Sequence, residues 1–215
     1  MKVRAERLDE ESIRYVYKTY MKIDFPRSEL KPLKSILSLI QQKRGEVYGF
    51  YDKDELTGYA FLIKAPSGRA YLIDYLAVLP SLRDRGYGSA CLSALQNILE
   101  EKNTLHSKIL STGENMKSTA NEREYMIMVE SEDPSFAADE TEKQVRRRRI
   151  RFYEKNGFFD SQNVCRLFGV EYRILGKTSC MTQEEPRNMR CREELDSIYR
   201  TIIPKLVYHS QVKWM

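Results

Sequence analysis

The sequence predicts an α/β (α+β) fold in which a mostly antiparallel sheet is flanked by helices. Three apolar, β-prone segments follow one another over residues 46–78, and the short turns between them indicate an antiparallel meander. The last of these segments runs directly into a turn and an amphipathic helix. Further along, a helical segment closes at Gly157, and apolar strand patterns follow it.

One strand and two helices are expected before the meander. Val3–Leu8 can form the strand. A helix over Glu10–Lys22 carries apolar side chains on one side and ends at Phe25-Pro26. A second helix, Leu30–Gln42, repeats apolar residues at helical spacing and stops before Gly45.

The meander consists of three predicted strands, which are Glu46–Asp52, Leu56–Lys64 and Arg69–Val78. The helix that follows is expected from Tyr87 to about Glu101. Over residues 102–124 the pattern weakens and becomes polar, so a mobile or partly helical insertion is expected there.

The second half of the chain predicts a further set of strands and helices. A strand at Tyr125–Glu132 precedes an arginine-rich helix over Thr141–Asn156. Strands at Phe158–Phe159 and about Val164–Ile174 follow. The C-terminal tail contains one expected helix, Arg187–Ile203, which the next residue, a proline, ends.

Length and composition limit the class of protein. The chain has 215 residues, of which 41% are hydrophobic and 31% charged, as expected for a soluble globular protein of one domain. No run approaches the ~20 apolar residues that cross a membrane, and the N-terminal residues lack the apolar stretch of a signal peptide. We therefore expect no membrane association and a cytoplasmic location.

The cysteines indicate neither a metal site nor a disulfide framework. Cys91, Cys165, Cys180 and Cys191 include no Cys-x-x-Cys pair, and the chain has only two histidines. Reduced thiols are therefore expected.

Residues 76–89 combine the end of a strand, a basic turn with two glycines and the start of a helix. A helix N-terminus exposes unpaired N–H groups and the positive end of its dipole, so such a segment can bind an anion. Gly86 and Gly88 let the backbone approach the ligand, while Arg83 and Arg85 add positive charge. The spacing fits neither a Walker loop nor a dinucleotide-binding turn. The pattern predicts a diphosphate site of another kind.

This segment resembles the acetyl-coenzyme A motif of the GNAT superfamily of N-acetyltransferases. That motif is Gln/Arg-x-x-Gly-x-Gly/Ala after a strand, and residues 83–88 match it. Residues 153–158 match a later motif, in which a helix ends Tyr-Glu-Lys-x-Gly-Phe. The resemblance implies a GNAT-like mixed sheet of about six to seven strands. It also implies an acetyltransferase domain over residues 1–176, with a C-terminal helical extension, 177–215, packed on it.

The resemblance implies acetyl-coenzyme A as the cosubstrate, with no metal. Free backbone N–H groups of Leu76, Ala77 and Val78 would bind the pantetheine arm and the acetyl oxygen. Tyr153 stands where the family's tyrosine protonates the departing thiolate. The residues that would hold the pyrophosphate are Arg83, Asp84, Arg85, Gly86, Tyr87, Gly88 and Ser89.

Several carboxylates are candidates for the catalytic base. Glu130 and Glu132 lie on one face of the expected strand because side chains alternate along it. Either could accept the amine proton, directly or through water, or attract a cationic acceptor, and a solvent-exposed strand end is the alternative. Asp74 and Tyr75 are further pocket candidates, whereas Leu72 stands where some relatives carry a glutamate.

The arginine run departs from the family pattern. Many relatives have an asparagine and a small residue where this chain has Arg146 and Arg149, which share the helix face of Tyr153. These arginines could reach cofactor phosphates or an acidic acceptor. The other interpretation of the run is a solvated helix face.

The favoured function is therefore acetyl transfer from acetyl-coenzyme A to a primary amine by direct attack. One alternative is a non-catalytic domain that binds acyl-coenzyme A as a sensor. A nucleic-acid-associated protein that uses Arg146–Arg151 is a less favoured one. The sequence leaves open the acceptor, a small molecule or a protein amine, and the state of the protein, a monomer or a homodimer.

Overall fold

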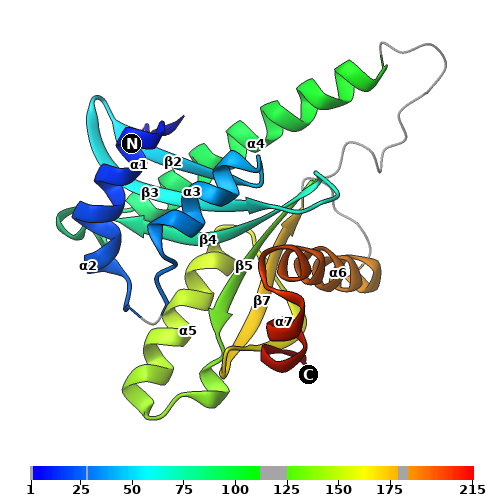
Figure 1. Cartoon of the computed structure of the whole chain (residues 1–215). Helices are drawn as coiled ribbons and strands as arrows, with labels where there is room; N and C mark the ends of the chain where they lie inside the picture. Colours follow the sequence, from blue (N-terminus) through cyan, green and yellow to red (C-terminus); the bar gives the residue numbers. More distant parts are fainter. Residues whose placement is uncertain (1, 28, 112–124, 179–183) are drawn as a thin grey trace. The chain divides into compact units, whose positions relative to one another are not determined.

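The computed structural model describes residues 2–27, 29–111, 125–178 and 184–215 (Figure 1). The chain divides into two compact units, and each is described by itself. Unit 1 comprises Met1–Lys64 and Ile73–Lys117, and unit 2 comprises Ala65–Leu72 and Ser118–Met215.

Unit 1 is built on the predicted meander. Its strands follow the order β1-β2-β3-β4, with antiparallel pairing of β1 with β2 and of β2 with β3. The buried aromatic rings of β2 and β3, such as Phe50 and Phe61, form much of its core. The bounds are β1 Arg4–Arg7, β2 Gly45–Asp52, β3 Glu55–Lys64 and β4 Ala70–Val78, of which the first three residues of β4 belong to unit 2.

The helices of unit 1 flank these strands. Figure 1 shows α3 in front of β2 and β3 and α4 behind them. The predicted first helix is present and contains a π-helical stretch, η1. Asp9 caps its start, since a side-chain oxygen accepts a hydrogen bond from Ser12 N at 2.9 Å. The bounds are α1 Glu10–Val16, η1 Tyr17–Met21, α2 Lys22–Asp24, α3 Leu33–Gln41, η2 Pro80–Leu82 and α4 Tyr87–Ser111.

Helix α4 extends beyond its predicted end at Glu101 to Ser111. Lys102 gives a physical reason, because its Nζ lies 2.6 Å from both Glu46 Oε2 and the Tyr48 hydroxyl of β2. A polar contact to the strand thus holds the helix at Lys102, the first residue beyond its predicted end. The rest of the predicted insertion, 112–124, lies outside the described residues.

Unit 2 holds the remaining strands, in the order β5-β7-β6-β8, and all three of their pairings are antiparallel. Asp139 caps α5 by accepting a hydrogen bond from Glu142 N at 2.8 Å. The bounds are β5 Met126–Glu132, η4 Pro134–Phe136, α5 Glu140–Lys155, β6 Phe159–Leu167, β7 Val170–Thr178, α6 Glu184–Ile202, α7 Lys205–Gln211 and β8 Val212–Trp214.

The predicted single strand Val164–Ile174 is wrong. The chain turns at Phe168 and Gly169, with φ angles of 49° and 87°, so β6 and β7 form a hairpin. A two-residue hairpin turn of this type requires positive φ at both central residues. The turn was not predicted because the first of them is an aromatic residue, whereas Asn, Asp or Gly usually stands there.

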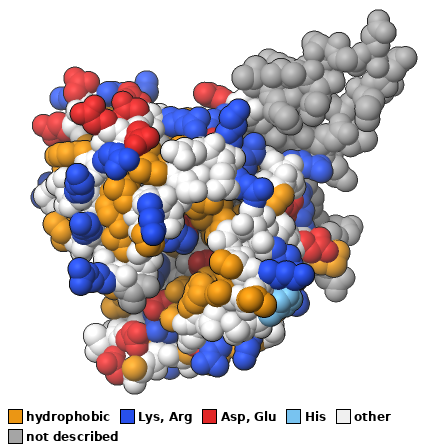
Figure 2. Space-filling view, viewed as in Figure 1, with side chains coloured by type: hydrophobic (Ala, Val, Ile, Leu, Met, Phe, Trp, Pro, Cys, Tyr) orange, Lys and Arg blue, Asp and Glu red, His pale blue; other side chains and the backbone are white. Residues whose placement is uncertain are grey.

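The C-terminal tail contains more structure than the one predicted helix. That helix is confirmed as α6, and α7 and the strand β8 follow it. Asp196 of α6 holds both, because its carboxylate accepts hydrogen bonds from the Tyr208 hydroxyl and from Trp214 Nε1. Burial by itself would raise the pKa of Asp196, but these hydrogen bonds to the carboxylate lower the pKa below its ordinary value. Leu206 is exposed on α7. Figure 2 shows hydrophobic side chains beside a histidine, drawn in pale blue.

The fold-class prediction is confirmed: this is a mixed α/β fold of mostly antiparallel strands with flanking helices and a helical C-terminal extension. Eight strands are present among the described residues, one of them the short β8 of the tail. The domain division at residue 176 remains a prediction. In the described part of the chain, no helix is long and apolar enough to span a membrane.

Candidate active site

The predicted diphosphate cradle lies in unit 1, between the end of β4 and the start of α4. Its turn has two residues with positive φ, Asp84 at 58° and Gly86 at 86°. A Cβ atom built on Gly86 would meet no heavy atom within 4 Å. The backbone here therefore faces open space, and alternating φ signs of this kind create concave groups of N–H donors that bind anions.

The start of α4 adds further donors to the cradle. Ala90 N bonds to Gly86 O at 3.2 Å, so the N–H groups of Tyr87, Gly88 and Ser89 precede the intrahelical ladder. The first turn of α4 contains no acidic residue. The dipole and the unpaired donors of this helix start can thus act together on an anion.

Arg83 braces the cradle. Its Nε donates to Val78 O at 3.0 Å, and its Nη2 donates to Asp24 Oδ1 at 2.7 Å. Asp24 also accepts a hydrogen bond from the Tyr59 hydroxyl at 2.8 Å. This arginine therefore connects the turn to the end of α2. The sequence predicts that the positive charge of Arg83 attracts the pyrophosphate, but in the structure Asp24 neutralises that charge.

Gly58 of β3 allows the end of β4 to lie close. A Cβ atom at Gly58 would stand 2.5 Å from the backbone oxygen of Ala77. One residue away, Leu79 N donates to Thr57 O at 2.9 Å. The position of Leu76–Val78 thus depends on a glycine that the motif does not include.

Gly58→Ala is expected to destabilise unit 1, because the added methyl group forces β4 away from β3. Overpacking of this kind costs roughly 1–3 kcal/mol of the free energy of unfolding. Urea unfolding of the variant and the wild type measures the difference. An unchanged free energy of unfolding would show that β4 accommodates the methyl group without strain.

Asp74 and Tyr75 of β4 hold the segment between α2 and α3. Lys31 Nζ lies 2.7 Å from Asp74 Oδ1. The Tyr75 hydroxyl donates to Glu29 O at 2.8 Å and accepts from Lys31 N at 2.9 Å. Burial raises the pKa of Tyr75 to about 12, so its hydroxyl stays protonated at neutral pH.

The second oxygen of Asp74, Oδ2, is buried and has no hydrogen-bond partner among the described residues. A buried carboxylate oxygen without a donor is costly, and a bound amine or a water molecule would satisfy it. Asp74 is thus a buried carboxylate of unit 1 that pairs with Lys31 through one oxygen and has its second oxygen enclosed.

Glu132 of β5 lies in an ion-pair network in unit 2. Its two carboxylate oxygens lie 3.4 Å from Arg146 Nη2 and 3.0 Å from Arg149 Nη1. Arg146 is buried and also pairs with Glu142, at 2.7 Å. The expectation that these arginines are available for cofactor phosphates or an acidic acceptor is therefore corrected, because carboxylates of unit 2 already engage them.

Glu130 has a different partner. Its Oε1 accepts a hydrogen bond from the hydroxyl of Tyr199, a fully buried residue of α6. Burial and the charge of Glu130 raise the pKa of Tyr199 well above its ordinary value, which keeps the hydroxyl a donor. Sequence reasoning missed Tyr199 because it lies in the tail, outside every motif.

Tyr153 lies near the end of α5 and is buried between aromatic rings. The ring centroids of Phe152 and Phe158 are 5.1 and 5.3 Å from its own. Burial raises its pKa to about 12, although the charge of Arg149 opposes the shift. No described residue hydrogen-bonds to its hydroxyl. The group therefore carries a proton at neutral pH that no acceptor among the described residues holds.

The cysteines show no sign of activation. Cys91, Cys165 and Cys191 are buried, and burial raises the pKa of each thiol to about 12. Cys180 lies outside the described residues. Within the described ranges, no group of three or more His, Cys, Asp or Glu side chains is arranged to hold a metal ion.

Comparison with known proteins places the chain in a family. Residues 10–121 match the model of the acetyltransferase (GNAT) family, so the chain belongs to that family. This match covers β2, β3, β4 and the cradle. A search of curated proteins found no significant match.

Solved structures share the fold at low sequence identity. A putative GNAT-family acetyltransferase from Bacteroides thetaiotaomicron superposes with a TM-score of 0.64 and 17% identity, over 94% of this chain and 99% of that one. The ribosomal-protein-S18-alanine N-acetyltransferase from Escherichia coli gives a TM-score of 0.54 and 16% identity, over 85% and 97%. An aminoglycoside acetyltransferase in complex with coenzyme A gives 0.55 and 17%, over 83% and 95%.

Proposed function

We propose that this protein is an N-acetyltransferase that transfers the acetyl group of acetyl-coenzyme A to a primary amine by direct attack. The observation that carries the proposal is the cradle, with its open backbone at Gly86 and the unpaired N–H groups at the start of α4. Membership of the acetyltransferase family supports it.

In this proposal the backbone of unit 1 binds the cosubstrate. N–H groups of Leu76, Ala77 and Val78 contact the pantetheine arm and the acetyl oxygen. The turn Arg83–Gly86 and the helix start Tyr87–Ser89 hold the pyrophosphate. Arg85 supplies positive charge that no described acidic residue neutralises, whereas Arg83 keeps the turn in place. The site needs no metal, because backbone dipoles and a proton donor meet the demands of the reaction.

The chemistry is an addition to the thioester carbonyl followed by loss of the thiol. The neutral amine attacks the carbonyl carbon, the new C–N bond forms, and the C–S bond then breaks. The amine gives up one proton to a base, and the departing thiolate takes one from the Tyr153 hydroxyl. A pKa of about 12 means that this hydroxyl carries its proton at neutral pH before the reaction begins.

Glu130 is the base that we favour. Both oxygens of Glu132 are already bound by arginines, so proton transfer to it would disrupt the network. The hydrogen bond from Tyr199 orients Glu130. Asp74, which pairs with Lys31, stays a pocket candidate without an assigned role. Glu132 is then a residue of the strand end that takes no part in the proton transfer.

Glu130→Gln is expected to flatten the acidic limb of the pH–rate profile, because that limb records protonation of the base. Glu132→Gln removes the same charge two residues away on the same strand and serves as the matched control. Initial rates from pH 5 to 9 measure both. If only the Glu132→Gln variant loses the limb, the base is Glu132.

Initial-velocity kinetics test the direct-transfer proposal. With acetyl-coenzyme A and an accepted amine both varied, direct attack requires a ternary complex and gives intersecting double-reciprocal lines. Parallel lines, together with an acetylated cysteine found by mass spectrometry after incubation without amine, would instead establish a covalent intermediate. The buried, weakly acidic thiols lead us to expect intersecting lines.

A further inference from the structure

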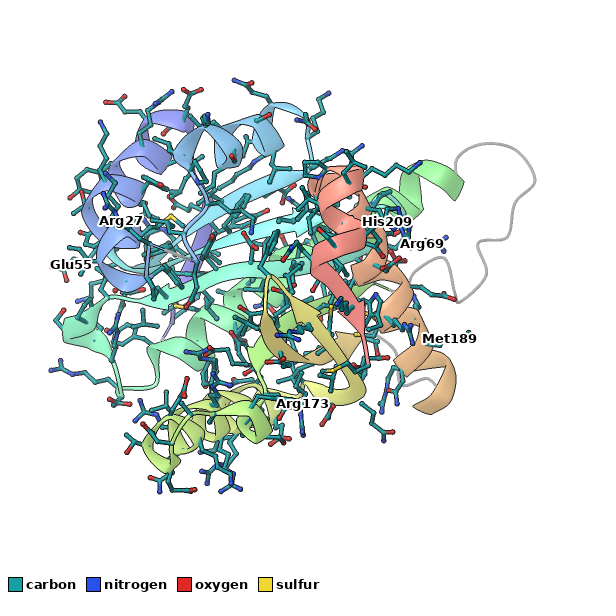
Figure 3. All side chains as sticks on the ribbon, turned by 60° about the horizontal axis from the view of Figure 1, so that its bottom comes forward. Arg27, Glu55, Arg69, Arg173, Met189 and His209 are labelled. Carbon is teal, nitrogen blue, oxygen red and sulfur yellow. The ribbon has the colours of Figure 1, made fainter. Side chains whose placement is uncertain are left out.

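A cavity of about 380 Å³ lies in unit 2, outside the residues assigned to acetyl transfer. Its walls come from η4, from one side of α5 and from β7. Pro134 and Ile150 form the apolar part, and Lys143, Arg147, Arg151 and Arg173 form the cationic part. Figure 3 labels Arg173, which lies next to α5. A volume of this size is within the range of pockets that bind small molecules.

The three cations from α5 stand on one side of the helix, because residues 143, 147 and 151 are each four positions apart. Two of them share one weak acidic partner: Glu140 lies 3.8 Å from both Lys143 Nζ and Arg147 Nη1. No described acidic side chain pairs with Arg151. Three positive charges and one negative charge leave an excess of about two positive charges on this wall.

The fourth cation, Arg173, adds no positive charge to the cavity, because two carboxylates surround it and leave a local excess of about one negative charge. Its guanidinium pairs with Asp133 at 3.2 Å and with Asp160 at 3.1 Å. These two carboxylates fix the arginine as a rigid wall of the cavity. The attraction for a ligand therefore comes from α5.

The arginine run is thus divided between two tasks. Arg146 and Arg149 turn toward Glu132 and Glu142 and are neutralised there. Arg147 and Arg151 line the cavity without comparable partners. If these arginines only faced solvent, we would not expect them to line a cavity together with the apolar side chains of Ile150 and Pro134.

We propose that this cavity binds a phosphomonoester with an apolar or aromatic ring, the chemistry of a nucleoside monophosphate. The excess positive charge of the α5 wall attracts the phosphate, and Lys143, Arg147 and Arg151 provide charge-assisted donors to it. The ring packs on Ile150 and Pro134. The proposal does not depend on acetyl transfer, since it uses none of the cradle residues.

Calorimetry with adenosine 5′-monophosphate as the probe tests the proposal. The titrations use the full-length Gly86→Glu protein, so that the cradle does not contribute, and are repeated in the wild type. Arg147→Gln combined with Arg151→Gln is expected to weaken binding at least about tenfold, because two charge-assisted contacts are lost. The matched control, Arg148→Gln with Lys155→Gln, removes two exposed charges of the same helix outside the cavity and is expected to change affinity less than about threefold.

Three results would overturn the proposal. The first is no heat of binding at millimolar nucleotide in either protein. The second is an equal loss in both double variants, which would assign the affinity to the overall charge of α5. The third is tighter binding of an oligonucleotide without terminal phosphates, dependent on Arg148 and Lys155, which would indicate a nucleic-acid surface. Failure of acetyl-coenzyme A to bind would leave this test unaffected.

Discussion

Gly86→Glu is expected to weaken the binding of acetyl-coenzyme A at least about 100-fold, because a carboxylate would enter the diphosphate cradle and repel the ligand. The fold should persist, since the side chain would extend into open space. Calorimetric titration with acetyl-coenzyme A measures the loss, and circular dichroism checks the fold.

Gly169→Glu provides a matched control for this variant. Gly169 has φ 87° against 86° at Gly86, and a Cβ there also meets nothing within 4 Å. The two substitutions therefore carry the same backbone strain and the same charge, but Gly169 lies in the β6–β7 turn. Equal affinities of the two variants for acetyl-coenzyme A would contradict the cradle assignment.

Tyr153→Phe is expected to lower the maximal rate by about 10²–10⁴-fold, because it removes the proton donor to the departing thiolate. The ring contacts with Phe152 and Phe158 remain, so the affinity for acetyl-coenzyme A should change little. Steady-state rates with saturating amine, alongside calorimetry, separate the two effects.

Tyr51→Phe serves as the control, because it also removes a phenol hydroxyl but at a position outside both motifs. We expect this variant to keep near-normal turnover. If the Tyr153→Phe protein also keeps near-normal turnover from pH 6 to 9, water or a helix dipole stabilises the thiolate. Tyr153 would then be a packing residue of the unit 2 core.

The parts of the molecule that sequence reasoning found are those with local signals. The change from strand to turn to helix was predictable because a strand end, two glycines and a helix start stand together within residues 76–89, whereas diphosphate binding by this segment stays a prediction. The alternation of Glu130 and Glu132 around the buried Ser131 was likewise predictable from the period of a strand. These features depend on neighbours in the chain.

The missed features depend on partners far away in the sequence. Asp24 neutralises Arg83 across 59 positions, and Tyr199 orients Glu130 across 69. Neither pairing has a pattern that a single sequence displays. The strand β8 was missed for a similar reason: its three residues carry no strand period of their own and are defined by pairing with β6.

The most direct test of acetyl transfer is the release of free thiol from acetyl-coenzyme A across a pooled library of amines, including polyamines, aminoglycosides and peptides with free amino groups. The proposed function predicts amine-dependent thiol release that the Gly86→Glu variant loses and the Gly169→Glu variant retains. Tight binding of acetyl-coenzyme A with no thiol release above the amine-free rate in any pool would contradict it, and would indicate a domain that senses the cofactor without using it.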